Sequence, residues 1–128
     1  MEKIKFYSLV YIMLFIEYMF RGCNSLESLD LTSFNTELVQ DMNGMFYDCI
    51  FLKILKTNFR APLVVDLRQM FFNCQQLISI DLSNFEGTSV QTMKDMFKYC
   101  FNLKTVNLSN FNAEKSQSMD DMFFFAYH

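Results

Sequence analysis

The stretch MFKYCFNLKTVNLSNF at residues 96–111 decides the fold of this chain, because it recurs almost whole as MFFNCQQLISIDLSNF at residues 70–85. Its opening Met-Phe pair also begins at residues 19, 45 and 122, so that five copies follow one another at intervals of 26, 25, 26 and 26 residues. A cysteine stands four residues after the methionine in the first four copies, and Ala126 replaces it in the fifth. Self-similarity at a fixed period is the signature of a repeat architecture.

A leucine pattern follows each cysteine and predicts a short strand. It runs from Leu26 to Phe34, from Leu77 to Phe85 and from Leu103 to Phe111, whereas the second copy is one residue shorter. Within it, apolar and polar residues alternate, as in Leu-Asp-Leu at residues 29–31, which is the period of a strand with one buried face.

The residues that precede each cysteine predict a short helix. Their apolar members recur at intervals of three or four positions, which is typical of one face of a helix; in the second copy they are Val39, Met42, Met45, Phe46 and Cys49. Because this register places Cys49, Cys74 and Cys100 on the apolar face with parallel side chains, we expect buried, reduced thiols at these positions, since a disulfide needs converging side chains.

A unit of about 25 residues cannot bury both a strand face and a helix face alone, so successive copies should stack. The sequence therefore predicts an α/β repeat fold. We expect a leucine-rich-repeat-like solenoid of about four turns of 25–26 residues, each with a short parallel strand and a short helix. Equivalent residues should then form ladders. The inward ladder would hold Leu29, Leu55, Ile80 and Val106, and the outward one Asp30, Lys56, Asp81 and Asn107.

The composite Met-Phe-x-x-Cys-x-x-Leu-x-x-Leu-x-Leu-Ser-Asn-Phe, almost complete at residues 70–85 and 96–111, resembles the repeat of BspA-like leucine-rich-repeat surface proteins. The resemblance covers about residues 13–125, and the Met-Phe-x-x-Cys step is not part of the common leucine-rich repeat. It implies a surface-exposed or secreted protein. Members of that family occur in bacteria, including mycoplasma-type lipoproteins, and in some parasitic protists, and several are implicated in adhesion to host matrix proteins and cells.

The chain divides into an N-terminal apolar segment, residues 1–12, and the repeat region, residues 13–128, which we expect to stop within the fifth repeat. Two interpretations of the first segment stay open. Charged residues followed by the apolar run 6–16 are typical of a signal peptide, and Gly22-Cys23 matches the end of a lipobox. Alternatively, Met13 and Ile16 share the register of Val39 and Met42, which favours a degenerate cap of the stack.

Composition disfavours several functions. A net charge of −3 lacks the basic footprint of a nucleic-acid-binding protein. One histidine and three glycines leave little material for a catalytic base, a metal cluster or a phosphate loop, so we expect neither an enzyme nor a cofactor. The apolar run at residues 6–16 is shorter than the roughly 20 residues of a transmembrane helix, so we expect no membrane span.

Two functions remain. The first is a non-catalytic, adhesion-type protein-binding module, at the cell surface or secreted, whose partner is an extracellular or cell-surface protein. The second is a structural repeat fragment without its own activity. Self-association through the uncapped end, residues 122–127, is a further expectation. The predicted binding residues lie on the outward strand positions and beside them: Glu27, Ser28, Asp30, Lys53, Lys56, Ser79, Asp81, Lys104 and Asn107.

Overall fold

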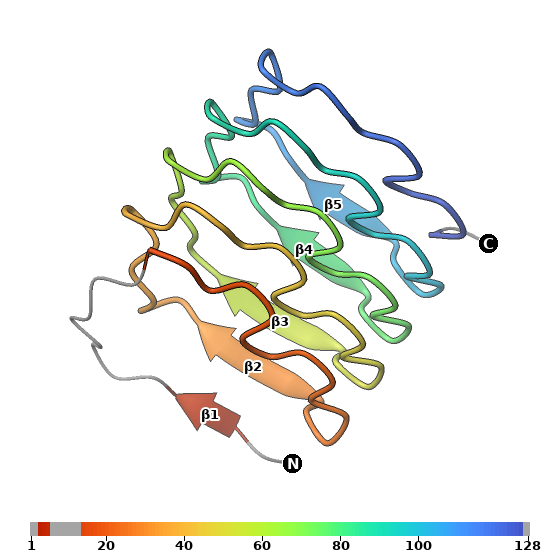
Figure 1. Cartoon of the computed structure of the whole chain (residues 1–128). Coiled ribbons are helices and arrows are strands. Elements are labelled where there is room, and N and C mark those ends of the chain that lie inside the picture. Colours follow the sequence, from red (N-terminus) through yellow and green to blue (C-terminus); the bar gives the residue numbers. More distant parts are fainter. Residues whose placement is uncertain (1–2, 6–13, 127–128) are drawn as a thin grey trace.

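The computed structural model describes residues 3–5 and 14–126, which form one parallel sheet backed by turns (Figure 1). Five strands pair in chain order, β1-β2-β3-β4-β5. They are β1 (Lys3–Lys5), β2 (Ser28–Leu31), β3 (Ile54–Thr57), β4 (Ser79–Asp81) and β5 (Thr105–Asn107). Each repeat thus makes one coil, which lies directly on the coil before it. Apart from β1, the predicted segment 1–12 lies outside the described residues.

The predicted strand ladders are confirmed by the register of the sheet. Leu29 of β2 pairs with Leu55 of β3, and Ile80 of β4 pairs with Val106 of β5. Leu31 pairs with Thr57, whose hydroxyl is accommodated because it donates to the carbonyl of Asp81 at 2.9 Å. The repeat length therefore places equivalent residues side by side.

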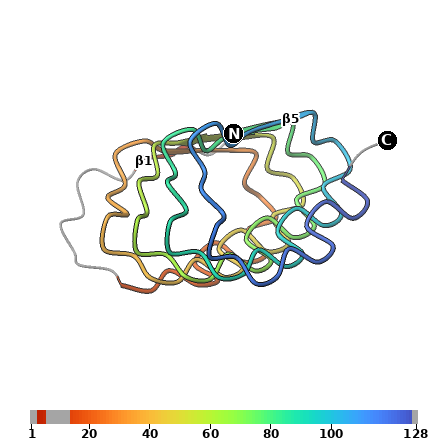
Figure 2. The ribbon, with the colours of Figure 1, turned by 90° about the horizontal axis from the view of Figure 1, so that it is seen from above.

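The predicted α/β solenoid with a helix in every turn is wrong, because the described residues contain no helix. In place of each helix stands a run of consecutive turns, which we call a turn segment. The five turn segments comprise residues 14–23, 40–49, 65–74, 91–100 and 117–126. Figure 2 shows the strands along one side of the stack and the turns along the other. No helix in the described part of the chain is long and apolar enough to cross a membrane.

Hydrogen bonding explains why turns replace the helix. In residues 42–49 alternate N–H groups bond within the coil, as from Met45 to Met42 at 3.2 Å, while those between bond to the next coil, as from Phe46 to Met70 at 2.8 Å. A helix would direct every N–H to the residue four positions earlier. Gly44 and Asp48 have positive φ, at 60° and 59°, which a type II turn requires and a right-handed helix forbids.

The core lies between the strands and the turn segments. Every apolar residue predicted for the helix face of the second repeat is buried, because the turns also bring residues inward at intervals of three or four. The phenylalanines of the Met-Phe pairs form one continuous stack, with neighbouring ring centroids 5.2–5.4 Å apart and planes within 5°. Cys49, Cys74 and Cys100 are buried with free thiols, as predicted.

Candidate functional site

The nine predicted binding residues all lie on one surface, which we call the strand face. It consists of the outward residues of β2 to β5 together with the residue that precedes each of these strands. All nine side chains are exposed or half-buried. Backbone hydrogen bonds hold in a row the residues that stand immediately before each strand. The N–H of Lys53 donates to the carbonyl of Glu27 at 2.8 Å, and the N–H of Lys104 donates to the carbonyl of Ile78 at 2.8 Å. The strand face is therefore a surface of fixed spacing.

Charges alternate across this face. Asp30 of β2 pairs with Lys56 of β3, and the Nζ atom of Lys53 lies 3.7 Å from a carboxylate oxygen of Glu27. Both members of the second pair are about half exposed, so water screens their attraction and the pair adds little to stability. The half-exposed side chains of Glu27 and Lys53 consequently remain accessible to a partner.

Three of the predicted residues also serve the local backbone. The carboxylate of Asp81 accepts the N–H of Ser83 at 2.8 Å, and Asp30 and Asn107 accept equivalent bonds from Thr32 and Ser109 at 3.1 Å. This is the Asx-turn geometry that ends a strand. Hydrogen bonding from Ser83 lowers the pKa of the Asp81 carboxyl. The acidic residues Asp30 and Asp81 of this face thus also have a structural role, because they end their strands.

Apolar residues that our sequence reasoning missed lie among these charges. Ile54 is 55% exposed and Ile78 is 45% exposed. They stand on neighbouring coils, since Ile54 pairs in the sheet with Ser79, the residue that follows Ile78. Phe51, three residues before Ile54, is also exposed. The alternation that buries Leu55 could have revealed Ile54, since the residue before an inward position points outward.

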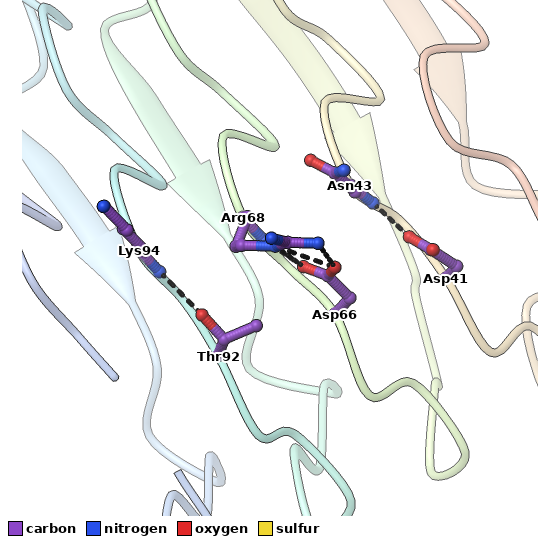
Figure 3. A network of polar contacts seen from close by, with 6 residues as sticks. All are labelled: Asp41, Asn43, Asp66, Arg68, Thr92 and Lys94. Atoms are coloured by element: carbon purple, nitrogen blue, oxygen red, sulfur yellow. Dashed lines mark hydrogen bonds and ion pairs between the residues drawn. The ribbon is translucent and has the colours of Figure 1, made fainter. Parts of the chain in front are cut away.

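A second polar surface runs along the turn segments (Figure 3). Isolated parallel bridges join Asp41 to Asp66 and Asp66 to Thr92. Each of these residues accepts a bond from the N–H two residues further on, which belongs to Asn43, Arg68 and Lys94 at 2.8, 2.8 and 3.4 Å. We call these six residues the polar row. Sequence reasoning assigned the turn segments to helices and therefore missed it.

Two of the charged residues in this polar row, Asp66 and Arg68, pair with each other. The guanidinium of Arg68 donates to Oδ2 of Asp66 at 2.6 and 2.9 Å and to Oδ1 at 3.1 Å, and these bonds raise the pKa of Arg68. Burial raises the pKa of Asp41, the N–H of Asn43 lowers it, and the neighbouring Asp66 carboxylate raises it further. The buried Oδ1 of Asn43 accepts no hydrogen bond from any described residue.

Beside this row lies a shallow hollow of about 230 Å³, lined by Tyr18, Asn43, Arg68, Gln69, Lys94 and Asp95. It mixes both charges, and its Arg68 is already paired with Asp66. Among residues 3–5 and 14–126 no group of three or more His, Cys, Asp or Glu gathers that could hold a metal ion. The geometry of both surfaces suits contact with a partner, and on the strand face exposed apolar residues stand beside charged ones.

A family model described as "Mycoplasma protein of unknown function, DUF285" matches residues 14–128. The match therefore spans all five turn segments and the strands β2 to β5. No curated protein and no solved structure matches the chain.

Proposed function

This chain belongs to the DUF285 family, and on that premise we propose that it is a non-catalytic protein-binding module of adhesion type, displayed at the cell surface or secreted. The likeness of its Met-Phe-x-x-Cys repeat to BspA-like leucine-rich-repeat surface proteins supports this proposal. An extracellular or cell-surface protein is the partner that this likeness favours.

One observation carries the proposal. Ile54 and Ile78 are exposed on adjacent coils, and Lys53 and Lys104 stand beside them in the row that precedes the strands. Apolar side chains at the centre of a patch, surrounded by polar groups that exclude water, are the usual energetic centre of a protein interface. The patch therefore has the composition of a binding site for a protein.

The backbone beneath the patch supports the same conclusion. Ile54 lies in β3, whose residues pair in register with those of β2 on one side, and Ser79 of β4 lies on the other. A site built on paired strands is positioned more accurately than one on a loop, so little conformational entropy is lost when a partner binds. The net charge of −3 disfavours nucleic acid as the ligand.

Binding to immobilised matrix proteins and to whole cells tests the proposal, with the double variant Ile54→Ser, Ile78→Ser against the parent chain. We expect the variant to lose at least about tenfold in affinity, because two buried aliphatic anchors contribute more than 1.4 kcal/mol. Leu38→Ser is the matched control, since Leu38 is an equally exposed leucine in a loop away from the strand face.

The alternative is a structural repeat without its own binding activity. A folded parent chain that binds neither the matrix proteins nor cells would establish this alternative. Equal losses in the Leu38→Ser control and in the double variant would likewise contradict a site on the strand face.

A further inference from the structure

The strand face carries its charges in a fixed order from one coil to the next. Hydrogen bonds between coils align the residues that precede the strands, and strand pairing aligns the outward residues near the strand ends. The two rows read, in coil order, Glu27, Lys53, Ile78, Lys104 and Asp30, Lys56, Asp81, Asn107. Neighbours in a row are about 4.8 Å apart, the spacing of paired strands.

Two cations of these rows have no acidic partner. Lys56 and Lys104 form no ion pair within the described part of the chain. Ile54 and Ile78 are exposed beside them. A partner that fits this surface therefore brings acidic groups to the lysines and apolar groups to the isoleucines.

The strand face itself offers that chemistry when a second copy faces the first. We consider a two-fold axis that runs parallel to the strands and lies between β3 and β4. The coils of the second copy then follow in reverse order, so that β3 lies opposite β4 and β2 lies opposite β5. Lys56 of one copy meets Asp81 of the other, and Glu27 meets Lys104. By symmetry each of these contacts between opposite charges forms twice.

The exposed isoleucines lie next to this axis. Ile54 belongs to β3, and Ile78 directly precedes β4. Across the interface Ile54 faces Ser79 of the second copy and is one residue along the strand from its Ile78. Apolar side chains of both copies thus meet at the centre with charged pairs around them, which is the usual anatomy of a protein interface.

Other two-fold arrangements of the strand faces bring like charges together. An axis that passes through β3 places Lys53 against Lys53, and one through β4 places Asp81 against Asp81. An axis that runs along the stack places Lys56 against Lys53 and Asp30 against Glu27. Like charges directly opposite each other are unfavourable, so the order of charges excludes these registers.

The isoleucines decide between the registers that remain. Shifting the axis by one coil in either direction brings no like charges together on β2 to β5. It moves Ile54 of one copy two coils away from Ile78 of the other, however. The axis between β3 and β4 therefore combines charge pairing with an apolar centre.

We propose that two copies of this chain bind each other through their strand faces, about a two-fold axis parallel to the strands between β3 and β4. The inference rests on the proposed function in taking the strand face as the binding site, and it names a second copy as the partner. The coils of β2 to β5 span roughly 20 Å, less than a standard interface of about 800 Å² per partner requires, so the pairing is weak and reversible. Many copies displayed on two surfaces add such contacts together.

Exchanging the charges of Glu27 and Lys104 tests the register. Glu27→Lys alone brings lysines together across the interface, and Lys104→Glu alone brings glutamates together. Each variant should weaken association by about tenfold in sedimentation equilibrium. An equimolar mixture of the two should associate as tightly as the parent, because each variant supplies the charge that the other lacks. The two positions are three coils, about 14 Å, apart in one chain, so they do not compensate each other within a copy.

General electrostatics do not explain recovery in the mixture, because both variants keep a net negative charge. Lys94→Glu is the matched control, since Lys94 is an exposed lysine in a turn segment on the other side of the stack. It should associate like the parent, although its net charge equals that of Lys104→Glu. Circular dichroism checks that every variant folds.

Three results would overturn the proposal. They are a parent chain that stays monomeric up to about 1 mM, a mixture that associates no better than its components, and equal weakening by Lys94→Glu. A monomeric parent that binds matrix proteins or cells, and loses this binding in Ile54→Ser, Ile78→Ser, would leave the proposed function intact. A parent that pairs with itself but binds neither would support this inference and contradict the proposed function.

Discussion

The Sγ atom of Cys74 lies 3.1 Å from the carbonyl oxygen of Phe46, one coil earlier in the stack, and its thiol donates to that oxygen. The same bond joins Cys49 to Phe20 and Cys100 to Phe71, each at 3.0 Å. The two most regular features of the sequence, the Met-Phe pair and the cysteine, are therefore partners across the coil boundary. A thiol suits this position because it is small and poorly hydrated and still satisfies a carbonyl.

The buried thiols predict a loss of stability at alkaline pH. Burial raises the pKa of Cys49 and of Cys100 to about 12, from an ordinary value of 9.0. Above pH 9 the unfolded chain releases these protons while the folded chain keeps them, so the free energy of unfolding falls as pH rises towards 12. At pH 10 the fall should be about 1.4 kcal/mol for each such thiol, measured by urea denaturation.

Cys100→Ser is the control for that pH dependence, because a serine hydroxyl keeps the bond to the Phe71 carbonyl and does not ionise in this range. We expect its stability to fall less between pH 8 and pH 10, by about 1.4 kcal/mol. An identical pH dependence in the parent and in this variant would show that Cys100 does not titrate as described.

Gly44 should tolerate no side chain. Its φ is 60°, and a Cβ atom there would overlap the ring of Tyr18. We expect Gly44→Ala to lower the free energy of unfolding by about 2–5 kcal/mol, from backbone strain and overpacking together. Gly22→Ala separates the two contributions, because Gly22 has a φ of 67° and no atom within 4 Å of a Cβ there. It should cost about 1–2 kcal/mol, and equal losses in both variants would refute the contact with Tyr18.

The phenylalanine stack should be most sensitive in its interior. Phe71 is fully buried between Phe46 and Phe97, so Phe71→Ala should cost about 3–5 kcal/mol by leaving a cavity. Phe123→Ala should cost clearly less in chemical denaturation of the monomeric chain, because the ring of Phe123 is already partly exposed. A larger cost at Phe123 than at Phe71 would contradict the order of burial along the stack.

Asn43 offers a stabilising substitution. Its buried Oδ1 has no partner among the described residues, and an unpaired buried acceptor costs about 1–3 kcal/mol. Asn43→Lys removes this atom and gives Asp41 a cation, as Arg68 does for Asp66. We expect higher stability and a lower pKa of Asp41 in an NMR titration. Asn43→Ala should raise stability while leaving the pKa of Asp41 above its ordinary value, and a raised pKa in both variants would disprove the pairing.

The charged positions of the candidate site could be predicted from the sequence, whereas the exposed isoleucines beside them were missed. The outward positions Asp30, Lys56 and Asp81 follow from simple alternation, because a strand with one buried face directs every second residue outward. Sequence reasoning missed Ile54 and Ile78 because it selected charged and polar residues, and because an isoleucine within a strand pattern is ordinarily assigned to the core. Their exposure is decided by register and not by residue type.

The amino-acid sequence by itself determined the period, the stacking and the inward ladders, because copies of 25–26 residues with like residues at like positions have one register that buries the Met-Phe pairs of the three inner copies. It did not determine the conformation opposite the strands. Inward residues at intervals of three or four suit a helix and a run of turns equally. Tertiary structure decided between them. The N–H of Phe46 donates to a carbonyl of the next coil at 2.8 Å, and such in-register bonds between coils replace the local hydrogen bonds on which a helix depends.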